Sequence, residues 1–153
     1  MGFFPFFKKK PFFNEAEQER IVQAIRSCER LTSGEIRVYV ESKNPLVSPL
    51  DRAKEVFFGL KMEKTDLRNG VLLYMATQHK ELALFGDEGI YKATGAEYWN
   101  AEVKKMLDAI KGSHIVDGVV GCILDVGEAL KTHFPYIPTE DKNELPDDIV
   151  FGK

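Results

Sequence analysis

The sequence has no uncharged apolar run long enough to cross a bilayer. About 18–20 such residues are needed, and the longest candidate, residues 115–130, contains three carboxylates. The N-terminal MGFFPFFKKKPFF also differs from a signal peptide, because its lysines follow a short apolar run and no small-residue cleavage site comes after it. We therefore expect a cytoplasmic protein without a transmembrane segment.

Cysteine and histidine are scarce. Cys28 and Cys122 form no CxxC motif and lie in apolar helical patterns, so we expect two small core residues in a reducing compartment rather than a disulfide. The three histidines show neither HxxxH nor HExxH spacing, which gives a transition-metal site no support. The sequence also lacks GxSxG, a P-loop and the Rossmann glycine motif.

Basic charge is not in excess. The 21 lysines and arginines are outnumbered by 24 acidic residues, and the net charge of −3 gives no signal for a nucleic-acid partner.

The 153 residues fit a single domain with a sizeable core. We expect three parts: a Phe/Lys-rich N-terminal arm at 1–13, a folded domain at 14–134 and an acidic C-terminal tail at 135–153 that packs weakly or is disordered.

The spacing of apolar residues predicts seven elements in the folded domain. The expected helices are 15–31, 49–61, 95–111 and 115–133, and the expected strands are 35–41, 70–76 and 81–85. The first strand alternates and should have one wet face, whereas 70–76 is apolar throughout and should be covered on both faces. A strand–helix–strand unit followed by a hairpin predicts an α/β fold, a three-layer α/β/α sandwich with a small mixed β-sheet.

The second strand of the hairpin is followed by the residues GDEG (86–89), which we call the turn. The start of one antiparallel strand lies beside the end of its partner, so the turn should meet the preceding linker (residues 63–69). Converging carboxylates favour a hard cation, Ca²⁺ or alternatively Mg²⁺. The alternative is a polar exit from the strand in which an acid caps the next helix. The residues expected to meet are Asp66, Asn69, Asp87 and Glu88.

The N-terminal arm combines six phenylalanines, three lysines and two prolines in residues 3–13. Its prolines oppose a helix. Two alternatives remain: peripheral contact with an anionic membrane, or an arm whose phenylalanines pack onto the domain or a neighbouring subunit.

Four segments of the sequence follow the pattern of one known family: TSGEIRVYVE (32–41), the helix with Asp51-Arg52-Ala53, RNGVLLYMA (68–76) and LALFGDEGIY (82–91). Together they resemble the TPM domain family, a former domain of unknown function. The resemblance covers about residues 14–134 and implies an α/β/α sandwich. It also implies divalent-metal binding, chiefly of calcium, and a weak acid phosphatase activity attributed to plant relatives.

The resemblance assigns Glu88 to the family glutamate of the strand-end turn and Asn69 to the asparagine before the apolar strand. Arg68 stands where many members carry an aspartate, which leaves Asp66 and Asp87 as replacement carboxylates. A cation at this position suits a phosphate and opposes a second metal. Many bacterial members carry a signal peptide and a C-terminal membrane helix, and we expect neither here.

The leading expectation is a cytoplasmic domain that binds Ca²⁺ or Mg²⁺ and mainly binds or regulates a protein partner. One alternative is a metal-assisted phosphatase, with three carboxylates on the metal and Arg68 on the phosphate. The other is a membrane-adjacent interaction module that uses the N-terminal arm.

Overall fold

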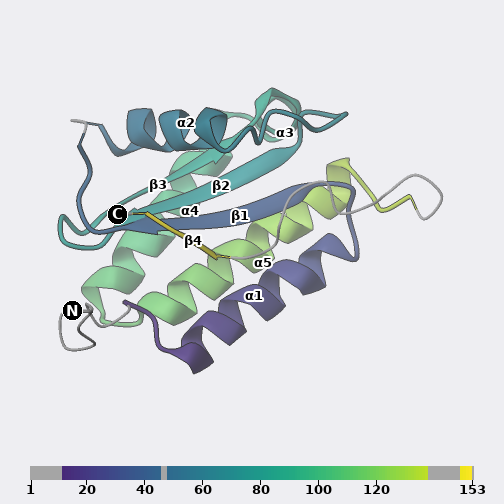
Figure 1. Cartoon of the computed structure of the whole chain (residues 1–153). Coiled ribbons are helices and arrows are strands. Elements are labelled where there is room, and N and C mark those ends of the chain that lie inside the picture. Colours follow the sequence, from purple (N-terminus) through teal and green to yellow (C-terminus); the bar gives the residue numbers. More distant parts are fainter. Residues whose placement is uncertain (1–11, 46–47, 138–148, 153) are drawn as a thin grey trace, which may run out of the picture.

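The computed structural model describes residues 12–45, 48–137 and 149–152 (Figure 1). The first half of the chain alternates helices and strands, and the second half is mainly helical. In chain order the elements are α1 (Glu15–Glu29), β1 (Glu35–Glu41), α2 (Pro49–Gly59), β2 (Gly70–Ala76), β3 (Glu81–Gly86), α3 (Glu88–Thr94), α4 (Ala96–Lys111), α5 (Ile115–His133) and β4 (Ile149–Phe151). No helix in these ranges is long and apolar enough to span a membrane.

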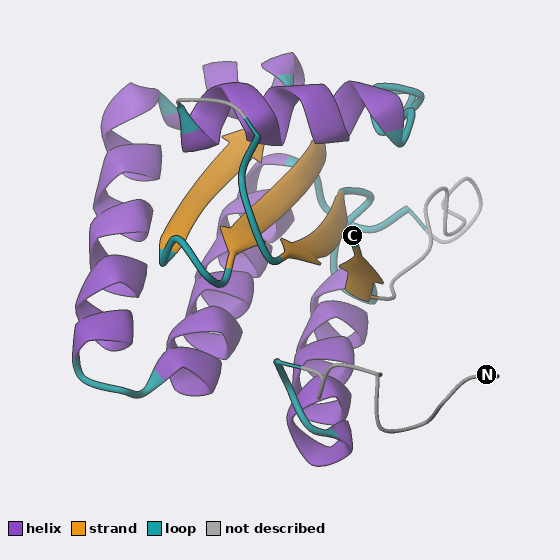
Figure 2. Ribbon diagram, turned by 60° about the vertical axis from the view of Figure 1, so that its left-hand side comes forward, coloured by secondary structure: helices purple, strands orange, loops and turns teal. Residues whose placement is uncertain are grey.

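The four described strands form one mixed sheet in the order β3-β2-β1-β4. β1 pairs in parallel with β2 and with β4, and β2 pairs antiparallel with β3. Helix α2 covers one face of the sheet, and α1, α4 and α5 cover the other (Figure 1, Figure 2). The expected α/β sandwich with a small mixed sheet is confirmed.

Two cores, one on each face of the sheet, explain the composition of the strands. β2 sends Val71, Leu73 and Met75 into the larger core with α1, α4 and α5, and Leu72 and Tyr74 into the smaller core under α2. This double burial accounts for its unbroken apolar character. Both cysteines are free and buried, as expected.

The polar face of β1 differs from the wet face that its alternation predicts. Glu35 and Glu41 are 3% and 5% exposed, and Arg52 of α2 meets the Glu41 carboxylate. The alternating pattern identifies the polar face of β1 correctly, but it does not say whether that face meets water or a buried polar side chain.

Two elements were not predicted. The seven-residue α3 follows its capping residue Asp87 and ends before Gly95, whose φ is +85°, and Ile90 is its only buried residue. A helix with one buried residue has no repeat of apolar residues, so its sequence gives no helical pattern to predict it from. The three-residue β4 is likewise too short for an alternating signal, and it pairs with β1 in a region that we expected to be a weakly packed tail. The rest of that tail, 138–148 and 153, lies outside the described residues.

At its N-terminus α1 begins with a capping box. Asn14 Oδ1 accepts from the Glu17 backbone N–H at 2.8 Å, and Glu17 Oε1 accepts from the Asn14 N–H at 2.9 Å. Residues 1–11 of the arm lie outside the described residues. Phe13 is fully buried in the larger core, whereas Phe12 is 45% exposed.

Candidate functional site

The linker and the turn meet at one end of the β2–β3 hairpin, as its antiparallel pairing requires. The Asp87 N–H donates to the Gly70 carbonyl at 2.9 Å, and the Gly89 N–H donates to the Arg68 carbonyl at 2.9 Å. The second bond satisfies one of the free N–H groups that begin a helix. The chain itself, through backbone contacts, therefore brings the acidic turn against the linker.

Gly89 makes this contact sterically possible. A Cβ atom at residue 89 would lie 2.2 Å from the Leu67 carbonyl oxygen and 2.7 Å from that of Arg68. Any other residue would push the linker away from α3. The glycine of the turn thus serves close packing of the chain on itself.

Arg68 lies between the two carboxylates of the turn. Its Nε and Nη2 donate to the two Asp87 oxygens at 2.7 and 2.9 Å, and its Nη1 lies 2.8 Å from Glu88 Oε1. Asp87 is 2% exposed, whereas the Glu88 carboxylate faces solvent. The hydrogen bonds to Asp87 are the main cause that raises the pKa of Arg68 above its ordinary value.

Asp87 has a second role as the cap of α3. Its Oδ1 accepts from the Glu88 N–H at 2.8 Å, in addition to the bond from Arg68. The capping alternative raised by the sequence is therefore confirmed for Asp87. A carboxylate has about four lone-pair sites, and three of those on Asp87 are already used.

The other two candidate ligands take no part in the contacts of this ion-pair cluster. Asn69 is 1% exposed, and its Nδ2 donates to Ser33 Oγ at 3.3 Å, while its Oδ1 is buried with no hydrogen-bond partner. Asp66 is exposed in the linker. Among the described residues no group of three or more His, Cys, Asp or Glu side chains is arranged to hold a metal ion. Asp87 and Glu88 suit a cation in their chemistry, but Arg68 holds that place.

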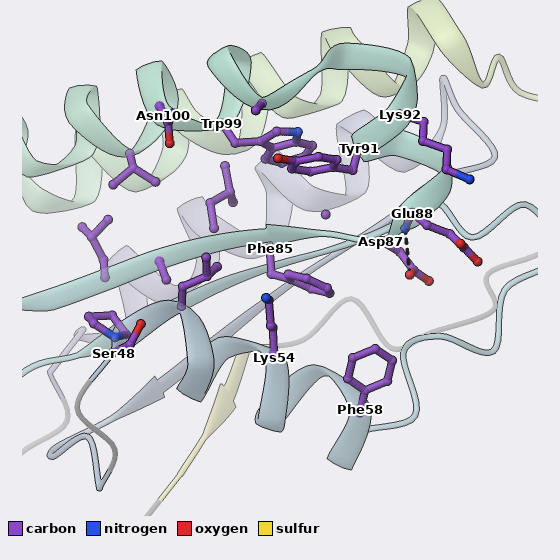
Figure 3. Close-up of a pocket in the computed structure, with 18 of the residues that line it drawn as sticks. Ser48, Lys54, Phe58, Phe85, Asp87, Glu88, Tyr91, Lys92, Trp99 and Asn100 are labelled. Atoms are coloured by element: carbon purple, nitrogen blue, oxygen red, sulfur yellow. Dashed lines mark hydrogen bonds between the residues drawn. The ribbon is translucent and has the colours of Figure 1, made fainter.

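A cavity of about 740 Å³ adjoins the cluster and follows β3 between α2 and α4 (Figure 3). We call it the β3 groove. Arg68, Asp87 and Glu88 form part of its lining, and its walls are mostly apolar. Tyr91 and Trp99 stack on the α3–α4 side, with ring centroids 6.4 Å apart and planes at 9°. No sequence motif signals this groove, because it arises where two helices flank the edge of a sheet.

A second buried ionic cluster, also unpredicted, joins the far end of β1 to α2. Arg52 Nε and Nη2 donate to the two oxygens of Glu41, each at 2.8 Å, and the Tyr74 hydroxyl donates to the same carboxylate. Burial, followed by the bond to Glu41, raises the pKa of Tyr74. This cluster ties helix to sheet beneath α2, and we assign it a structural role.

A polar cavity of about 460 Å³ between α4 and α5 contains a third ionic cluster. Lys105 Nζ lies 3.2 Å from both Glu102 Oε2 and Asp125 Oδ2. Burial is the main cause that raises the pKa of Glu102; the bond from Lys105 opposes it and Asp125 adds to it. Glu102 therefore takes up a proton more readily in the folded protein than in the unfolded chain.

Glu102→Gln should raise the free energy of unfolding by about 1 kcal/mol at neutral pH and leave it unchanged in acid. A raised pKa means that wild type loses stability as pH rises from the ordinary glutamate pKa through the folded value. The amide removes that loss and can donate to Asp125. Urea unfolding of both proteins across this pH range checks the prediction, and a constant difference at every pH would contradict it.

Known proteins share this sequence pattern and this fold. A family model described as the TPM domain matches residues 7–129. The NMR structure of BA42 protein from the psychrophilic bacterium Bizionia argentinensis superposes with a TM-score of 0.85 at 37% identity, covering 95% of this chain and 99% of that one. A search of curated proteins found no match.

A second solved structure shares the fold alone. The N-terminal domain of a protein from P. gingivalis, solved by solution NMR, gives a TM-score of 0.64 at 15% identity, covering 80% of this chain and 78% of that one. The family model spans most of the residues that form the sandwich and the ion-pair cluster. The chain belongs to the TPM domain family.

Proposed function

We propose that this TPM domain is a binding and regulatory module in which Ca²⁺, or alternatively Mg²⁺, competes with Arg68 for Asp87 and Glu88. The observation that carries the proposal is the guanidinium held between these two carboxylates. Neighbouring carboxylates repel one another unless a positive charge lies between them. Their oxygens are also the ligands that hard divalent cations prefer.

The surrounding residues offer further oxygen ligands. The Asn69 Oδ1 has no hydrogen-bond partner, and the Asp66 carboxylate is exposed in the same linker. Displacing Arg68 from a bidentate pair costs free energy, so binding should be weak, with a dissociation constant of about 10⁻⁴–10⁻³ M. Since Arg68, Asp87 and Glu88 also line the β3 groove, cation binding would change one end of that groove.

Arg68→Gln should strengthen Ca²⁺ binding by about tenfold, at the low end of the 1.5–3 kcal/mol that hydrogen bonds to charged groups contribute. The substitution removes the internal competitor but keeps a polar side chain. Calorimetric titration measures the affinity, and amide chemical shifts of the linker and the turn locate the site. Glu88→Gln in the same background should reverse the gain.

Arg20→Gln is the matched control, because Arg20 pairs with Asp117 at 2.8 Å on a different surface, where both side chains are exposed. It should leave Ca²⁺ affinity at the wild-type value. If wild type and Arg68→Gln both show no heat and no shift changes at millimolar Ca²⁺, the cation proposal is wrong.

The other two functions expected from the sequence gain less support. The phosphatase alternative assigned Arg68 to a phosphate, yet its Nε, Nη1 and Nη2 each contact Asp87 or Glu88. The membrane alternative depends on the N-terminal arm, whose residues 1–11 lie outside the described part of the chain.

A further inference from the structure

We propose that the β3 groove binds an extended, partly acidic peptide segment of a partner protein, which pairs with β3 and lengthens the sheet. This inference rests on the binding role proposed above and names the chemistry of the partner. It does not require the cation.

The first support is the outer edge of β3, which pairs with no other described strand although its residues are largely buried in the groove. In the antiparallel pair, hydrogen-bonded and non-bonded positions alternate, and the bond from the Asp87 N–H to the Gly70 carbonyl fixes which are which. Leu82, Leu84 and Gly86 therefore direct their N–H and C=O groups away from β2. In the sheet formed by the described strands, β3 is terminal, so no strand there uses these groups. A row of unused backbone groups is a template for strand addition.

The second support is the depth of this edge. Helix α2 lines one side of the groove through Leu50, Lys54 and Phe58, and α4 lines the other through Trp99 and Val103. Figure 3 shows β3 between these two walls. In a second copy of the chain β3 is equally recessed between α2 and α4, so the helices of the two copies would collide before their β3 strands could pair. A single extended chain can lie about 4.8 Å from β3, the usual spacing of paired strands.

The third support is the apolar character of both walls. Phe58 and Tyr91 are 47% and 44% exposed, which is high for large aromatic side chains, and they stand on opposite sides of β3. Side chains of an added strand point alternately to one wall and the other. The partner segment should therefore carry apolar residues toward both walls.

The fourth support is unpaired positive charge in a chain of net charge −3. Lys54 extends from α2 toward β3 and Phe85, and Lys92 stands on α3 beside the turn (Figure 3). In the described part of the chain neither lysine has a carboxylate partner. Arg68, by contrast, is neutralised by Asp87 and Glu88. A carboxylate on the peptide supplies the missing partner.

The test is selection of a phage-displayed library of random nonapeptides on the full chain in EDTA. We expect enriched sequences with apolar residues on both faces and at least one Asp or Glu. Synthetic copies should slow hydrogen exchange at the amides of Leu82, Leu84 and Gly86. Lys54→Glu/Lys92→Glu should weaken their binding by about tenfold or more, whereas Lys104→Glu, an exposed α4 residue outside the groove lining, should not.

The proposal is overturned if no peptide is enriched relative to the Lys54→Glu/Lys92→Glu protein, or if exchange slows elsewhere. It is also overturned if the three amides are already protected in the free protein. Protection that depends on protein concentration would identify a second copy as the occupant, and constant protection would identify another part of the same chain. Because the selection contains no cation, its failure leaves the Ca²⁺ titration result standing, and the reverse also holds.

Discussion

Replacing Arg52 by alanine should lower the free energy of unfolding by about 3–5 kcal/mol, the range measured when one partner of a buried ion pair is removed. The Glu41 side chain is 4% exposed and accepts two hydrogen bonds from Arg52 at 2.8 Å. Without Arg52, its carboxylate stays buried with Tyr74 as its remaining donor among these residues. Urea denaturation at neutral pH measures the loss.

Two comparisons isolate the cause of this loss. Glu55→Ala removes a partner of Arg52 that is 56% exposed, so it should cost no more than about 1 kcal/mol. Replacing Glu41 and Arg52 together by leucine should recover much of the stability, because two apolar residues leave no buried charge. A loss below about 1 kcal/mol for Arg52→Ala would contradict the assignment.

The same pair sets a pH dependence. Burial would raise the pKa of Glu41, but the bonds from Arg52 and Tyr74 outweigh burial and hold that pKa below its ordinary value. A lowered pKa contributes stability above the ordinary glutamate pKa, and this contribution is lost as pH falls through the folded value. The difference between wild type and Arg52→Ala should therefore shrink in acid.

Gly89→Ala should cost about 1–3 kcal/mol or more, as overpacking typically does. The new Cβ would lie 2.2 Å from the Leu67 carbonyl oxygen, a backbone atom that cannot rotate away. The linker must then move, which breaks the bond from the Gly89 N–H to the Arg68 carbonyl. Denaturation measures the cost, and amide shifts of the linker should change together with those of α3.

Gly121→Ala is the matched control for this substitution. Gly121 lies within α5, and a Cβ there meets nothing within 4 Å. Alanine should therefore stabilise the protein by about 0.5–1 kcal/mol, the usual gain in a helix interior. If Gly89→Ala has the same sign as Gly121→Ala, the close packing of the linker against α3 is not what requires glycine.

Local patterns were sufficient for the sandwich and for the meeting of the two loops. β2 is apolar on both faces because both faces are covered, and hairpin pairing alone brings the linker to the turn. The role of Arg68 was not accessible in this way. In sequence, a guanidinium next to two carboxylates is equally consistent with a phosphate ligand and with a counter-ion, and only the folded contacts of Arg68 with Asp87 and Glu88 distinguish the two. Arg68 adopts a left-handed φ of +51°, which sequence spacing does not indicate.

The Glu41–Arg52 pair and the β3 groove depend on tertiary placement. Alternation assigned Glu41 to a wet face, but the position of α2 over the sheet determines whether water or Arg52 meets it. The groove likewise requires the relative position of two helices that are far apart in sequence. Both features depend on how the helices pack on the sheet. The spacing of apolar residues along the sequence carries no information about that packing.

The pairing of β4 with β1 has a consequence for synthesis of the chain. β1 at residues 35–41 is made early, yet its partner at 149–151 leaves the ribosome more than a hundred residues later. Until then the edge of β1 lacks this neighbour, and closing so long a loop is slow. A nascent chain that stalls before residue 149 should therefore expose a second strand edge, a surface on which incomplete chains aggregate.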